Sequence, residues 1–180
     1  MNYLSTLFFL LGISLSLWSQ SFTDLSIRPL NSGYDEHNPL LSPDGTLYFT
    51  IANHPLNIGG KKDPGDIWFS NWSGKEWSTP IHGGPSLNDR GYNAATGFSS
   101  DGNQIFLVNH YSKSGSAGTQ GISWARKTQA GWTFPENISI PYFINRSSLL
   151  SGQLVEELGI FITRQKRMIR KARKIFMCRE

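Results

Sequence analysis

The four histidines are the residues best suited to acid–base chemistry or metal binding, and their spacing argues against both. They lie 17 to 28 residues apart, so none forms a His-x-x-x-His pair or has a glutamate partner at metal-ligand spacing (His37, His54, His82 and His110). His37 could act as a ligand at a sheet edge, but we interpret it as a solvated loop residue. The single cysteine, Cys178, excludes an internal disulfide and a cysteine-based zinc site.

The other candidate chemical groups are aspartates and serines in turn-like contexts. Asp63 and Asp66 flank Pro64-Gly65 and could bind calcium, but the further oxygen ligands of such a site are missing, so we favour a turn. Ser42 and Ser99 have no Gly-x-Ser-x-Gly context and no paired histidine. No phosphate loop or dinucleotide fingerprint is present. The sequence therefore predicts a protein that is not an enzyme, with no catalytic, cofactor-binding or metal-binding residues.

The elements around these residues predict an all-β fold. Aromatic residues make up 13% of the chain, which also holds 18 Gly and 9 Pro, a composition typical of short strands joined by tight turns. Ser42-Pro43-Asp44-Gly45 reads as a turn, with Gly45 in the left-handed conformation. The next residues, 46–50, alternate polar and apolar side chains as in a half-buried strand.

A second copy of this unit follows 57 residues downstream, where Ser99-Ser100-Asp101-Gly102 precedes Ile105-Phe106-Leu107. Four more landmarks recur at nearly the same period (Trp68 and Trp124, Trp77 and Trp132, Pro80 and Pro135, Asn88 and Asn145). Each copy contains four short strands in meander order, the content of a β-propeller blade. We expect the four tryptophans to pack between neighbouring sheets rather than to contact a ligand.

Residues 31–145 resemble the TolB-type, WD40-like propeller repeat. The resemblance rests on the Ser-x-Asp-Gly turns and on Asp66-Ile67-Trp68-Phe69-Ser70. It is close to the version found in exported Bacteroidota proteins, where such blades often precede an OmpA-like peptidoglycan-binding domain. It implies a periplasmic, secreted or outer-membrane-associated protein whose partner is another protein or a cell-wall glycan.

We divide the chain into five segments. Residues 1–19 read as a signal peptide because their apolar run is too short to span a bilayer, and the mature chain is expected to have no transmembrane span. Blade 1 with a leading strand occupies 20–87, blade 2 occupies 88–145, and 146–154 begin a third blade. Because a propeller needs at least four blades, we expect an incomplete propeller: a fragment, or a chain that assembles with other chains.

The tail, residues 155–180, departs from the repeat. It carries eight Lys or Arg against three Glu, a net charge of +5, so the rest of the chain is slightly acidic and no nucleic-acid-binding domain is indicated. Read from the third codon base, residues 171–180 permit Gly-Thr-Glu-Asp-Ile-Tyr-Val-Ser-Gly, which resembles the third strand of blade 1. We hypothesise a shifted reading frame; the alternative is a basic helix at a membrane surface or anionic polymer.

These observations favour a non-catalytic β-propeller interaction module of an exported cell-envelope protein. Two alternatives stay open at this point. The chain could be the non-catalytic propeller of a larger secreted hydrolase or peptidase, which a downstream Gly-x-Ser-x-Gly motif would reveal. It could also be the product of a broken gene.

Overall fold

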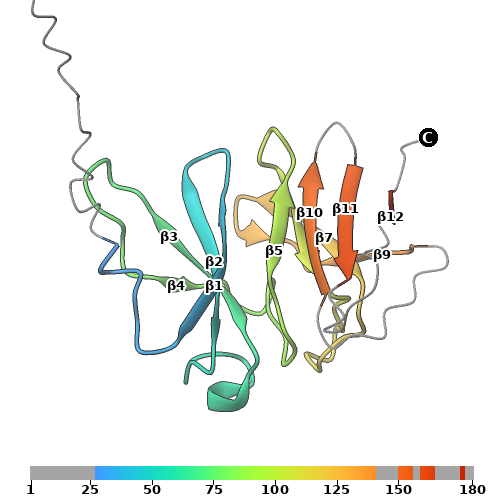
Figure 1. Cartoon of the computed structure of the whole chain (residues 1–180), viewed down its shortest axis with the longest axis horizontal. Helices are drawn as coiled ribbons and strands as arrows, with labels where there is room; N and C mark the ends of the chain where they lie inside the picture. Colours follow the sequence, from blue (N-terminus) through green and yellow to red (C-terminus); the bar gives the residue numbers. More distant parts are fainter. Residues whose placement is uncertain (1–26, 141–149, 156–158, 165–174, 177–180) are drawn as a thin grey trace, which may run out of the picture.

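The structure, a computed structural model, describes residues 27–140, 150–155, 159–164 and 175–176. These residues form antiparallel sheets of four, five and three strands, which follow one another in chain order (Figure 1). The helical content of the described residues is one short 3-10 turn, η1 (Gly60–Lys62). The predicted all-β class is confirmed, and none of the sheets closes on itself.

Sheet 1 is a simple antiparallel meander in the order β1-β2-β3-β4. Its strands are β1 (Asp35–Leu41), β2 (Thr46–Ala52), β3 (Asp66–Asn71) and β4 (Ile81–His82). The predicted turn joins β1 to β2: the Gly45 amide donates to the Ser42 carbonyl over 3.0 Å, and Gly45 has a φ of 82°. The Asp44 side chain accepts from the Thr46 amide at 3.1 Å, as an aspartate in this turn position commonly does. The four-stranded expectation is confirmed here.

Sheet 2 has five strands, so the expectation of four is wrong for the second copy. The strands are β5 (Ala95–Phe98), β6 (Gln104–Val108), β7 (Ile122–Thr128), β8 (Gly131–Trp132) and β9 (Glu136–Ile138). β8 pairs with one end of β7 and β9 pairs with the other, so two short strands share the place of a fourth. Sheet 1 has the same arrangement in weaker form, with a Trp72–Trp77 bridge ahead of β4.

Sheet 3 contains β10 (Leu150–Val155), β11 (Gly159–Arg164) and β12 (Ile175–Phe176). Its strands fall in the region where the sequence predicted a third unit followed by a basic tail. The described part of that tail is extended. The signal segment 1–19, the landmark Asn145 and the most basic stretch, 165–174, lie outside the described residues.

The pairing register corrects one of the sequence landmarks. The turn in sheet 1 is closed by the pair Ser42 and Thr46, whereas the turn in sheet 2 is closed by Ser99 and Gln104, one residue further along. Thr46 then pairs with Asn71, and Gln104 pairs with Arg126. Counting back along the third strand, Trp68 corresponds to Ser123. Trp124 takes the position of Phe69, on the opposite face of the sheet.

With this register, the sheets pack in one consistent direction. The face of sheet 1 that carries Tyr48, Ile67 and Phe69, called here the trailing face, packs on the opposite, leading face of sheet 2 (Ile105, Leu107, Ala125). The trailing face of sheet 2 in turn packs on Leu150 of β10 (Phe106, Val108, Ile122). The same face of sheets 1 and 2 therefore packs on the sheet that follows it in the chain.

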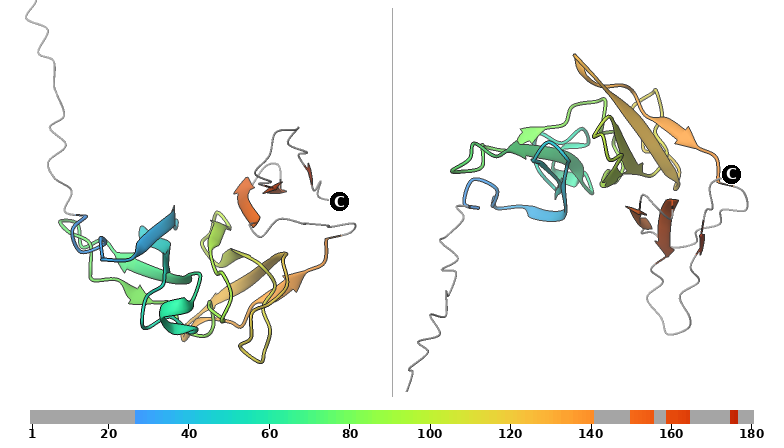
Figure 2. Two further views of the ribbon diagram at one scale, coloured as in Figure 1. Left: turned by 60° about the horizontal axis from the view of Figure 1, so that its bottom comes forward. Right: turned by 90° about the horizontal axis from the view of Figure 1, so that it is seen from above.

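The leading face of sheet 1 has no sheet before it in the described residues. Phe49, Ile51 and Trp68 form a small cluster there, against which Leu30 and Leu47 pack. The two tight turns of sheet 1 lie at one end of the sheet, and the long connections 53–65 and 109–121 lie at the other end of their sheets (Figures 1 and 2). The fold therefore offers two distinct ends and one unpartnered leading face for contacts.

Candidate binding surface

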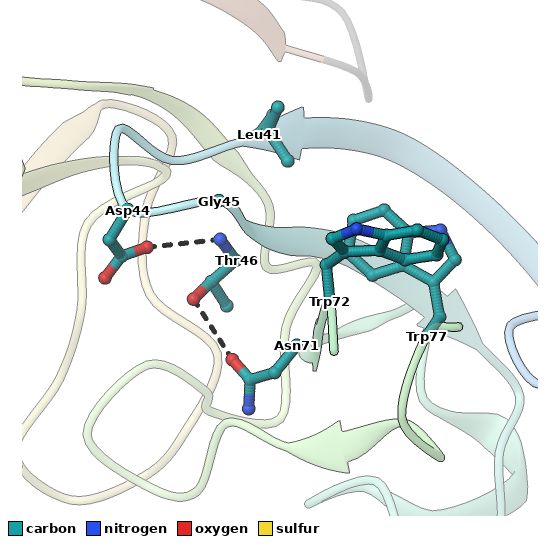
Figure 3. Close-up of a pocket in the computed structure, with 7 residues that line it drawn as sticks. All are labelled: Leu41, Asp44, Gly45, Thr46, Asn71, Trp72 and Trp77. Carbon is teal, nitrogen blue, oxygen red and sulfur yellow. Dashed lines mark hydrogen bonds between the residues drawn. The ribbon is translucent and has the colours of Figure 1, made fainter. Parts of the chain in front are cut away.

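A pocket of about 420 Å³ opens at the turn end of sheet 1 (Figure 3). It is formed by the β1–β2 turn, the last residue of β3 and the hairpin that follows. Its lining combines two indole rings and one leucine with a carboxylate, a hydroxyl and an amide (Leu41, Asp44, Gly45, Thr46, Asn71, Trp72 and Trp77). This mixture of aromatic surface and polar groups is typical of a recognition surface.

Trp72 and Trp77 form the aromatic wall of this pocket. Their ring centroids are 5.2 Å apart with an interplanar angle of 56°, and 37% of Trp72 is exposed. Leu41, on the other side, is 60% exposed. Thr46 Oγ1 donates to Asn71 Oδ1 over 3.1 Å, which orders the polar side of the pocket. Adjacent exposed apolar side chains of this size mark a contact surface more often than isolated ones do.

Sheet 2 shows what the same positions do when a sheet precedes them. The register makes Phe98, Lys127 and Trp132 the counterparts of Leu41, Trp72 and Trp77. Phe98 packs on Tyr48 of sheet 1 with ring centroids 5.1 Å apart. Trp132 also contacts Tyr48, and its Nε1 donates to the Tyr48 hydroxyl over 3.3 Å. The pocket of sheet 1 thus occupies the position of an interface that is filled in sheet 2.

An ion pair completes the filled interface. Lys127 Nζ lies 2.6 Å from Asp44 Oδ2. The ammonium group of Lys127 and the Ser42 hydroxyl hold the pKa of Asp44 well below its ordinary value, and the same bond raises the pKa of Lys127. Both side chains are more than two-fifths exposed, so solvent screens the attraction. The pair orients the two sheets more than it stabilises them.

Two of the four histidines meet, around Trp68. The Trp68 ring centroid lies 4.5 Å from that of His54 and 4.9 Å from that of His82. His82 Nε2 lies 2.8 Å from Asp66 Oδ2, while the Gly84 amide donates to His82 Nδ1 over 3.1 Å. Both ring nitrogens of His82 are therefore engaged, which leaves neither free to act as a base on a substrate.

The other two histidines lie apart from each other. His37 is in β1 and stacks on Tyr92, with centroids 5.7 Å apart and nearly parallel rings, so the expected solvated loop position is wrong. Burial lowers the pKa of His37, opposed by the nearby Asp35 carboxylate. His110 Nδ1 lies 3.0 Å from Thr119 Oγ1 within the 109–121 connection. His37 and His110 therefore each contact other residues of the fold, and they do so in separate places.

Asp63 and Asp66 organise the connection between β2 and β3, as the turn interpretation predicts. The Gly59 and Gly65 amides donate to the Asp63 carboxylate over 2.8 and 2.9 Å, and the Ile58 amide donates to Asp66 over 2.6 Å. Burial raises the pKa of Asp63 despite these donors. In the described parts of the chain, no three His, Cys, Asp or Glu side chains are arranged to hold a metal ion.

The packing between sheets that was predicted for four tryptophans is confirmed for only part of them. Trp132 packs as predicted, against the core between sheets 1 and 2. Trp68 is buried, with 5% exposed, but on the leading face of sheet 1, where no described sheet precedes it. Trp77 instead lines the pocket, and Trp124 is partly exposed, with the Arg126 guanidinium 5.4 Å from its ring centroid. Sequence reasoning missed Trp72, which has no aromatic counterpart in the second copy. Its position five residues before Trp77, across a Ser-Gly turn, is the signal that could have found it.

Comparison of the chain with family models, curated proteins and solved structures finds no match in any of the three. Among the residues that the structure describes, no helix is long and apolar enough to cross a membrane.

Proposed function

We propose that this chain is a non-catalytic β-propeller interaction module of an exported cell-envelope protein. Each sheet would be one blade, and the module would bind a protein or a cell-wall glycan through the surfaces of its repeat. The TolB-like resemblance of residues 31–145 supports the envelope assignment.

The observation that carries the proposal is the order of the packing. The trailing face of sheet 1 packs on sheet 2, and the equivalent trailing face of sheet 2 packs on Leu150 of sheet 3. Repetition of one such step is how a propeller is built. The hydrogen-bonded aspartates and serines stabilise connections and turns. Asp63 and Asp66 accept hydrogen bonds from backbone amides between β2 and β3, and the Ser42 and Ser99 hydroxyls donate to aspartates within the turns. A scaffold that binds a partner would use its polar side chains in this way, to hold turns and connections in place.

Cell fractionation tests the envelope assignment. The full chain with a C-terminal tag, produced in a Bacteroidota host, should be found in the periplasmic or outer-membrane fraction. Its N-terminus should be Gln20, read by mass spectrometry. A variant lacking residues 2–19 is the matched control and should stay in the cytoplasm. Full-length protein that remains cytoplasmic with residues 1–19 attached would overturn the proposal.

A binding assay tests the choice of partner. Purified peptidoglycan, sedimented with the tagged chain, should carry the protein down in a saturable manner if the glycan is the partner. Trp72→Ala removes the most exposed indole of the pocket and should weaken this binding if the pocket contacts the glycan. Absence of any sedimentation would leave a protein partner as the only form of the proposal.

A further inference from the structure

The leading face of sheet 1 is covered in its middle by the chain's own N-terminal part and is open at its turn end. Leu30 packs against the cluster that contains Phe49 and Trp68, each of which is 5% exposed. At the turn end, Leu41 and Trp72 are 60% and 37% exposed. A sheet that packed across this face would displace Leu30, whereas a small ligand at the turn end would not. The pocket of Figure 3 is therefore the part of the face that suits a small ligand.

Three polar side chains line this pocket in a hydrogen-bonded row (Figure 3). The Thr46 amide donates to Asp44 and the Thr46 hydroxyl donates to Asn71 Oδ1, each over 3.1 Å. Asn71 Nδ2 has no partner among the residues that the structure describes, so it keeps two N–H donors. The Ser42 hydroxyl, the Thr46 amide and the Lys127 ammonium take three of the roughly four acceptor positions of the Asp44 carboxylate. The row thus holds a donor and an acceptor on opposite sides of Thr46.

The pocket is close to neutral in charge. Asp44 is the ionisable side chain of its lining, and the Lys127 ammonium lies 2.6 Å from Asp44 Oδ2. A ligand with a carboxylate would be repelled by Asp44, and a cationic ligand would have to compete with Lys127 for it. The electrostatics of the pocket therefore favour a neutral ligand that has both hydrogen-bond donors and acceptors.

We propose that the pocket binds a neutral N-acetylated sugar unit of a cell-wall glycan, an inference that rests on the proposed function. The apolar face of the sugar ring packs on the Trp72 and Trp77 indoles. The N–H and C=O of an acetamido group point in opposite directions, which matches the acceptor of Asp44 and the donors of Asn71. A hexose without this group lacks the pair, and a proline-rich peptide offers no proline N–H to the carboxylate.

A fluorescence titration of the purified full chain tests this inference. The probe is the trimer of β-1,4-linked N-acetylglucosamine, which should bind in a saturable manner. Cellotriose has a hydroxyl in place of each acetamido group and should bind about tenfold more weakly. Trp72→Ala removes stacking surface and should weaken binding of the trimer about tenfold. Asn71→Ala removes the donor to the acetamido carbonyl and should reduce the preference for the trimer over cellotriose.

Trp124→Ala is the matched control, because it removes an indole of sheet 2 that lies outside the pocket lining and should leave binding of the trimer unchanged. Circular dichroism checks that each variant is folded. The trimer should also release the chain from sedimented peptidoglycan, which assigns the sugar to the cell wall.

Four results would overturn the inference: no saturable binding of the trimer, equal binding of cellotriose, tighter binding of a polyproline peptide, or no release from peptidoglycan by the trimer. None of them would alter the outcome of the fractionation test. Failure of this inference and failure of the envelope assignment are therefore distinguishable.

Discussion

Lys127 of sheet 2 reaches back to the first turn of sheet 1, where its Nζ lies 2.6 Å from Asp44 Oδ2. These residues are 83 positions apart in the chain. The contact fixes the turn of one sheet against the third strand of the next, and Gly102 of the second turn lies near Pro43 of the first. The Asp44–Lys127 contact therefore helps to define how sheet 2 is positioned against sheet 1.

Removing this ion pair should have a small and acid-sensitive effect. Lys127→Met is expected to lower the free energy of unfolding by about 0.5 kcal/mol at neutral pH and low salt. Because the folded-state pKa of Asp44 is depressed, the pair contributes stability above the unfolded value of 3.8, and this contribution is lost as the pH falls through the folded pKa. Urea unfolding at pH 7 and pH 3 measures both effects. Lys113→Met is the control, and an effect that grows in acid would contradict the assignment.

The two equivalent tryptophans should differ in their contribution to stability. Trp132→Ala empties part of the core between sheets 1 and 2 and should lower the free energy of unfolding by about 2–4 kcal/mol. Trp77→Ala removes a ring that lines an open pocket and should cost under about 1 kcal/mol. Urea titrations of both variants under one condition give the comparison. Equal losses would mean that Trp77 packs as tightly as its counterpart.

Asp89 should make the protein less stable at neutral pH than at mildly acidic pH. Burial raises the pKa of Asp89, with the Gly91 amide opposing the shift. The folded state then binds more protons than the unfolded state between 3.8 and the raised pKa, so stability falls as the pH rises through that window. Asp89→Asn should reduce this fall, leaving the part due to Asp63, and be more stable than the parent at pH 7, while the exposed Asp35→Asn should change little. A parent chain whose stability rises throughout this window would refute the prediction.

Gly45 should matter through its backbone conformation alone. It has a φ of 82°, and no atom lies within 4 Å of the position that a Cβ would take there. Gly45→Ala should therefore cost about 1–2 kcal/mol, the penalty for an L-residue in the left-handed region. Gly33→Ala is the matched control, because Gly33 also faces open space but lacks a positive φ in this range. Thermal unfolding of both variants should separate them, and similar melting temperatures would disprove the conformational explanation.

The sequence predicts the strands and turns of this fold well because the information for them is local. Gly45 and Gly102 mark the turns, and alternation of apolar side chains marks β2 and β6. Which side chains lie on which face of a sheet is not encoded locally, because it depends on the pairing register, and the two copies have turns of different length. Matching Trp68 with Trp124 was therefore wrong by one position. The pocket was missed because Trp72 is significant only beside Trp77 and opposite Leu41, a relationship set by three segments of the sheet.

The extra residue in the second turn has a consequence for how such repeats diverge. Asn103 lies between Gly102 and Gln104, and side chains alternate along the strand that follows. The longer turn absorbs this residue, because Ile105 pairs with Phe98 just as Leu47 pairs with Leu41. The inward and outward sets of the strand therefore stay the same, while the sequence positions of the two copies move out of step by one. Copies of such a unit can differ in turn length and keep their packing, and an alignment anchored on the turn glycine then matches residues of opposite faces.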